Sequence, residues 1–69
     1  MIFVFKTSVK NGKQVKQLKP HIDQLLPNAK WNFDLQDIDK VLRIDSNESP
    51  VRLVIDLLTI HRFHCEELP

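Results

Sequence analysis

The sequence predicts a small α+β domain in which two helices cover one face of a four-stranded antiparallel sheet. Three observations predict this fold class. The chain has 69 residues, which is enough for one small hydrophobic core and too few for two. Its apolar residues recur with a period of two in some segments and with helical spacing in others. These segments follow one another in the order strand, helix, strand, strand, helix, strand. We therefore expect one domain over residues 1–69.

The first strand is expected at residues 2–7, because its four consecutive apolar residues are typical of a strand in the middle of a sheet. The turn signal Asn11-Gly12 then precedes a helix. The apolar stripe of this helix follows spacings of three, four, three and one, at Val15, Leu18, Ile22, Leu25 and Leu26. Pro20 lies inside the stripe. Because proline lacks an N–H and crowds the preceding turn, we expect a kink there rather than a helix that begins at Lys19.

Residues 30–45 carry the pattern of a hairpin. Trp31, Phe33 and Leu35 alternate with polar residues in the first half, and Leu42 and Ile44 follow the same alternation in the second. With residues 37–40 as the connecting loop, the expected register places Leu35 opposite Leu42, Phe33 opposite Ile44 and Asp34 opposite Arg43. The hydrophobic pattern and the charge pairing favour the same register.

A second helix is expected from Pro50 to about Ile60. Ser49 supplies a side-chain oxygen for the first free N–H groups, and a proline at the first helical position loses nothing by lacking an N–H. The last strand, residues 62–68, is short and charged as an edge strand should be, with Phe63 and Cys65 facing the helices. The complete order predicts a split-βαβ, or ferredoxin-like, βαββαβ sandwich.

Composition and charge exclude several classes of protein. The net charge is +1 and the pI is near 7.9, without the basic excess of dedicated nucleic-acid-binding proteins. The open face of the sheet should present Asn32, Asp34, Asp45 and Glu66 rather than stacking aromatic rings, so we expect no nucleic acid as a partner. One cysteine excludes an internal disulfide, and no apolar run reaches the roughly 20 residues of a membrane span. We expect a cytoplasmic protein without membrane association.

Nothing in the sequence groups as a catalytic site. An enzyme needs a nucleophile with a base in reach, or paired carboxylates in a pocket. Asp37 and Asp39 flank the hairpin loop and are explained as turn residues. With one glycine, the chain has no phosphate-binding loop. We therefore expect a non-enzymatic protein without a cofactor.

Four segments carry a resemblance to a known family: residues 3–7 (Phe-Val-Phe-Lys-Thr), residues 25–35 with their Leu-Leu-Pro start and Trp-Asn-Phe-Asp-Leu end, residues 41–44 (Val-Leu-Arg-Ile) and residues 62–68 (Arg-Phe-His-Cys-Glu-Glu-Leu). Through them, nearly the whole chain resembles the heavy-metal-associated domain, the βαββαβ module of copper chaperones and metal-pumping ATPases. The resemblance rests on the core pattern and implies the ferredoxin-like fold. In that family, a Met-x-Cys-x-x-Cys loop after the first strand holds a soft metal ion. The matching residues 6–14 contain no Cys, His or Met, so no metal ligand is implied here.

A displaced metal site is the alternative. His61, His64 and Cys65 lie within five residues and are borderline or soft ligands. His64 and Cys65 are adjacent on a strand, however, and should point to opposite faces. His61 is also explained by its favourable place at the C-terminal end of a helix, and Cys65 by burial as a small apolar residue. The alternative function is therefore a metal-ion carrier that uses this site, with a dimer as one way to complete it.

Charge is distributed unevenly along the chain. Residues 1–30 hold six lysines and one aspartate, a balance of +5, whereas residues 31–69 hold four basic and eight acidic residues, a balance of −4. Lys10, Lys13 and Lys16 should gather at the first loop and helix start, where cations oppose the helix dipole. In the resembled family, lysines near this end dock onto acidic partner domains. We expect a non-enzymatic binding or regulatory module that docks an acidic protein partner through these lysines, with a lysine face that serves only solubility as the competing explanation.

The second helix carries more apolar surface than a core needs. Its apolar residues cover an arc of roughly 220° on a helical wheel. One edge should pack on the sheet and the other on the first helix, which leaves Leu53 and Ile60 exposed. These two residues could form a partner surface or support a weak homodimer.

Overall fold

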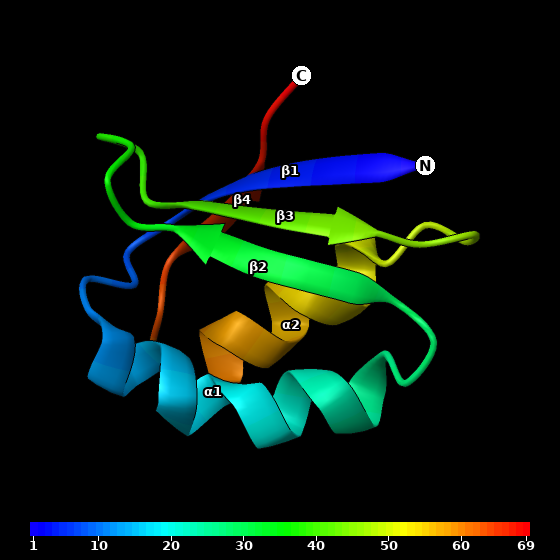
Figure 1. The fold of residues 1–69 in the computed structure, drawn as a ribbon, viewed down its shortest axis with the longest axis horizontal. Helices are drawn as coiled ribbons and strands as arrows, with labels where there is room; N and C mark the ends of the chain where they lie inside the picture. Colours follow the sequence, from blue (N-terminus) through cyan, green and yellow to red (C-terminus); the bar gives the residue numbers. More distant parts are fainter.

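The computed structural model describes residues 1–69 and has one four-stranded sheet with both helices on the same face, below the sheet in Figure 1. The elements are β1 (Ile2–Thr7), α1 (Gly12–Leu25), β2 (Lys30–Asp34), β3 (Val41–Asp45), α2 (Val51–Ile60) and β4 (Cys65–Glu67). The strand order is β2-β3-β1-β4, and each neighbouring pair is antiparallel. The predicted α+β fold class with a ferredoxin-like βαββαβ arrangement is confirmed.

The hydrophobic core lies between the sheet and the two helices. Nine buried side chains form it: Phe5, Val9, Leu18, Ile22, Leu42, Ile44, Val54, Leu58 and Cys65. β1 is central and pairs with β3 and β4, and Phe5 stands opposite Leu42 in the middle of the sheet. Side chains directly opposite on neighbouring strands share one face, so these two residues meet the helices together. The predicted bounds of β1 and β3 are confirmed.

α1 begins at Gly12 and continues through Pro20, so a helix that starts at Lys19 is excluded. Asn11 caps it: its Oδ1 accepts a hydrogen bond from the Gln14 N–H at 2.9 Å, and the Gln14 Oε1 accepts one from the Lys10 N–H at 2.7 Å. This reciprocal arrangement resembles a capping box and occupies two free donors at the helix start. The carbonyl that lacks a partner because Pro20 has no N–H belongs to Lys16, and both residues are exposed.

The hairpin register differs from the prediction by two residues. β2 ends at Asp34, and the pairs are Trp31 with Ile44, Asn32 with Arg43, Phe33 with Leu42 and Asp34 with Val41. The connecting loop is longer than expected because the Asp34 Oδ1 accepts hydrogen bonds from the N–H groups of Gln36 and Asp37, which turns the chain before Leu35 can pair. A shift of two preserves the face of every side chain. The predicted ion pair of Asp34 and Arg43 also survives at 3.5 Å, as a diagonal rather than a direct neighbour.

α2 begins one residue later than predicted and ends at Ile60, as predicted. Pro50 is the residue before the first helical turn, and the Ser49 Oγ lies 3.5 Å from the Val51 N–H, so the expected serine cap is weak. At the other end, the Arg62 N–H bonds to the Thr59 carbonyl and the Phe63 N–H bonds to the Leu58 carbonyl. These two bonds form a Schellman motif, with Arg62 in the left-handed conformation at φ 69°. Because the motif uses residues up to 63, β4 begins only at Cys65.

Candidate functional site

Lys10, Lys13 and Lys16 lie in the loop after β1 and in the first turns of α1, as predicted. All three side chains are exposed, and none forms an ion pair. The first turn of α1 contains no acidic residue. Three uncompensated cations therefore stand at the positive end of a helix dipole, where they do not stabilise the helix.

The structure adds Arg62 to this end of the molecule. The loop between α2 and β4 is joined to the loop after β1 by two hydrogen bonds of Ser8: its N–H donates to the His64 carbonyl at 3.1 Å, and its Oγ accepts from the His64 N–H at 2.8 Å. Arg62 is exposed on that neighbouring loop and forms no ion pair. We call Lys10, Lys13, Lys16 and Arg62 the basic end. Sequence analysis did not find Arg62, because 46 residues separate it from Lys16 and no local pattern links them.

Two other lysines of the first half form ion pairs with acidic side chains. Lys6 lies 3.7 Å from Asp39, and Lys19 lies 2.9 Å from Asp23 on the next turn of α1. The Asp23 carboxylate also accepts a hydrogen bond from the Trp31 indole N–H, and the two bonds, that from Lys19 foremost, hold the pKa of Asp23 below its ordinary value. The positive charge predicted for residues 1–30 is therefore left unpaired mainly at the basic end.

Leu53 and Ile60 are exposed, as predicted, with 49% and 74% of their surface accessible. They lie seven residues apart on one side of α2. The two helices run antiparallel (Figure 1). Leu53 lines the same pocket as Leu25 at the end of α1, whereas Ile60 is the last residue of α2, at the opposite end of that helix. The structure therefore does not bring Leu53 together with the lysines. Ile38, in the β2–β3 loop, is more exposed than either, at 91%, and sequence analysis did not single it out.

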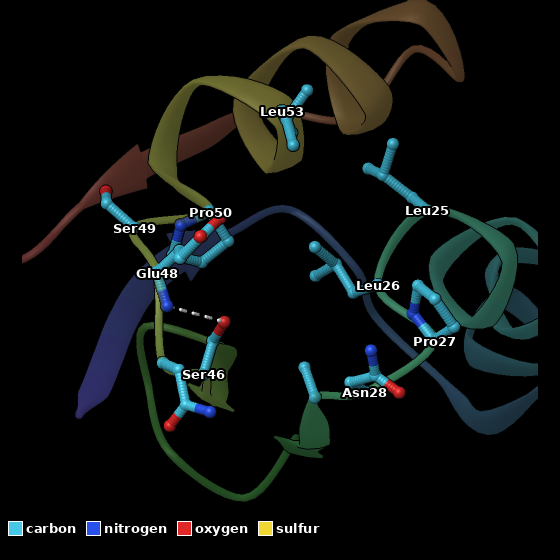
Figure 2. A pocket seen from close by; sticks show the side chains of 11 residues that line it. Leu25, Leu26, Pro27, Asn28, Ser46, Glu48, Ser49, Pro50 and Leu53 are labelled. Carbon is cyan, nitrogen blue, oxygen red and sulfur yellow. Dashed lines mark hydrogen bonds between the residues drawn. The ribbon is translucent and has the colours of Figure 1, made fainter.

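A shallow pocket lies where α1 ends and α2 begins (Figure 2). Its volume is about 360 Å³. Leu25, Leu26 and Leu53 border it on the helix side, and Ser46 and Glu48 come from the loop that precedes α2. The Glu48 N–H donates to the Ser46 Oγ at 3.4 Å across this loop. Fewer than half of its lining residues are hydrophobic, and no hydrogen bond joins the Glu48 carboxylate to the Ser46 or Ser49 hydroxyl.

The alternative metal ligands are separated by the structure. Cys65 is buried in the core, whereas its neighbour His64 is exposed and lies 3.5 Å from Glu66. Burial, with a contribution from the Glu66 carboxylate, raises the pKa of the Cys65 thiol to about 11. A thiol that holds its proton so strongly is a poor metal ligand at neutral pH. His61, His64 and Cys65 do not form a group of three that could hold a metal ion.

His61 instead contacts a histidine that the sequence places far away. Its ring lies against the ring of His21, with centroids 4.4 Å apart and planes tilted by 40°. His21 is on α1, and His61 directly follows the last residue of α2. Sequence analysis did not single out His21, since only the packing of one helix on the other brings the two rings together.

Comparison with protein-family models, with curated proteins and with solved structures gives no significant match to this chain. Neither helix has the length and apolar character required to cross a membrane.

Proposed function

We propose that this chain is a non-enzymatic binding module, built like a heavy-metal-associated domain without its metal-binding loop, that docks an acidic protein partner through the basic end. One observation carries the proposal: Lys10, Lys13 and Lys16 are exposed and unpaired at a helix start whose dipole they oppose. Helix stability does not explain these positions. An acidic partner surface would compensate all of them at once.

The arrangement of charge fits a salt-sensitive interaction. The basic end combines two loops that are hydrogen-bonded through Ser8, so its cations are presented by a fixed backbone. Exposed charges attract a partner over about 10 Å in 0.1 M salt and less at higher ionic strength. Binding through this surface should therefore depend on salt mainly through the association rate.

The resemblance to the heavy-metal-associated family supports the proposal through two features. The fold has the element order of that family, and the lysines occupy the loop and helix start where that family carries both its metal and its docking lysines. In this chain the loop from Lys6 to Gln14 offers lysines and no metal ligand. We propose that docking is the part of the family's function that this loop can perform.

The test is affinity capture from the native host at low and at physiological salt, followed by measurement of the captured partner's affinity. The variant Lys13→Glu/Lys16→Glu should lose binding at least tenfold, because the attraction becomes repulsion. The control variant Lys30→Glu/Arg52→Glu changes the net charge by the same amount at exposed positions elsewhere and should bind nearly as well as the wild type. An equal loss of affinity in both variants would mean that binding depends only on net charge. Unchanged affinity in both would mean that the lysines serve only solubility.

A further inference from the structure

The His21–His61 pair bridges the two helices at their solvent-facing side. The ring centroids are 4.4 Å apart, and the rings are tilted by 40° rather than stacked in parallel. His21 is exposed and His61 is half-buried. A ligand can therefore reach both rings without unfolding any part of the core.

Neither imidazole is committed to another contact. No side-chain hydrogen bond and no ion pair involves His21 or His61, in contrast to His64, which pairs with Glu66. The position of His61 at the end of α2 has an explanation in helix electrostatics. That explanation does not apply to His21, which lies inside α1.

Two free imidazoles at this separation suit a metal ion. Zinc and similar ions bind imidazole nitrogen at about 2.0 Å, and two such ligands of a tetrahedral ion stand about 3.3 Å apart. The 4.4 Å centroid distance is shorter than the roughly 5 Å at which two imidazoles share one tetrahedral ion. Side-chain rotations must therefore move the rings slightly apart before one nitrogen of each can bind the ion. Imidazole is a borderline ligand that suits divalent zinc, nickel and copper.

We propose that His21 and His61 form a two-ligand site for a borderline divalent transition-metal ion, which links α1 to α2. No third His, Cys, Asp or Glu side chain joins them, so solvent fills the remaining coordination positions. The site differs from the loop of the heavy-metal-associated family in ligand type and in place, and it does not depend on the docking function. Because the two ligands are 40 residues apart in the chain, the folded state binds the ion more tightly than the unfolded one.

Calorimetric titration of the full chain with Ni²⁺ and Zn²⁺ at neutral pH tests the proposal. We expect one ion per chain and a rise of several degrees in the unfolding midpoint at saturating metal. His21→Ala and His61→Ala should each lower the metal affinity at least tenfold. The double variant should lose no more affinity than either single variant, because both residues belong to one site. His64→Ala, which removes the third histidine, should bind as the wild type does.

His61→Gln replaces the alanine variant if that variant loses its fold, as judged by circular dichroism. Absence of binding by the wild type at millimolar metal would overturn the proposal. So would binding that survives in His21→Ala, or binding that is lost in His64→Ala or Cys65→Ser. The last two results would place the ion at the end of α2 and at β4 instead.

Discussion

The Asp23 carboxylate accepts a hydrogen bond from the Trp31 indole N–H at 2.9 Å and thereby ties α1 to β2 at the edge of the sheet. The second carboxylate oxygen accepts from Lys19 at the same distance, and the Lys19 ammonium lies 5.7 Å from the centre of the Trp31 ring. Trp31 is the one tryptophan in the chain. Tryptophan fluorescence therefore reports the surroundings of this one ring, including its contact with Asp23.

Acid titration should reveal the contact. The bonds from Lys19 and Trp31 lower the pKa of Asp23 from 3.8, so its stabilising contribution is present above that value and is lost as the pH falls through the lower folded-state pKa. We expect the Trp31 emission of the folded chain to change only below about pH 3.8. Asp23→Asn should abolish that step and shift the emission at neutral pH. Asp56→Asn, which breaks the exposed pair with Arg52, should leave it in place.

Phe5→Ala should destabilise the protein by about 3–5 kcal/mol, since it deletes a fully buried aromatic ring from the central strand. Ile38→Ala is the matched control. Because Ile38 is 91% exposed, this substitution should leave the free energy of unfolding almost unchanged. Urea denaturation of the three proteins measures both values. A cost below about 1 kcal/mol for Phe5→Ala would contradict its place in the core.

The hairpin register can be tested with an engineered disulfide. Asn32 and Arg43 stand opposite one another and are both exposed, so Asn32→Cys/Arg43→Cys should oxidise to an intramolecular bridge. Asp34→Cys/Arg43→Cys, the direct pair of the register predicted from sequence, is a diagonal here and should bridge poorly. Mass spectrometry after mild oxidation distinguishes the two. Preferential bridging of the second pair would favour the predicted register.

Arg62→Gly should raise the free energy of unfolding by up to about 1 kcal/mol, because Arg62 holds a left-handed conformation that costs little for glycine. Arg52→Gly removes the same side chain within α2, where glycine costs about 1 kcal/mol. Chemical denaturation measures both changes in the free energy of unfolding, and changes of opposite sign would confirm the Schellman motif. Destabilisation of both variants would indicate that the Arg62 side chain itself contributes to the fold.

Cys65 should resist thiol reagents in the folded protein, since it is buried and its pKa is raised to about 11. Because the folded-state pKa lies above the ordinary value of 9.0, the unfolded chain loses this proton first. The protonated Cys65 thiol therefore contributes fully to the free energy of unfolding below about pH 9, and this contribution declines as the pH rises to about 11. Labelling rates with and without denaturant, and unfolding of wild type and Cys65→Ala across that range, measure both effects. Rapid labelling of the folded chain would contradict the burial of Cys65.

The kinds and order of the elements follow from the sequence because hydrophobic periodicity is a local property. The structure confirms three elements that such local patterns predicted: the apolar run of residues 2–7, the alternation of residues 41–45 and the apolar stripe of α1. The exposure of Leu53 and Ile60 was also predictable, since the apolar arc of α2 is wider than one helix can bury. The faces of the hairpin residues are correct for the same reason, even though their partners are not.

Contacts between distant segments were decided only by the tertiary structure. The register depends on how Asp34 turns the chain, and a shift of two leaves the pattern of faces unchanged, so the hydrophobic pattern cannot detect it. Arg62 joins the lysines because Ser8 bonds to His64, and His21 meets His61 because α1 packs antiparallel to α2. Periodicity states which side of an element faces inward. It does not state which residue of another element lies opposite, since that depends on loop geometry and on packing between helices.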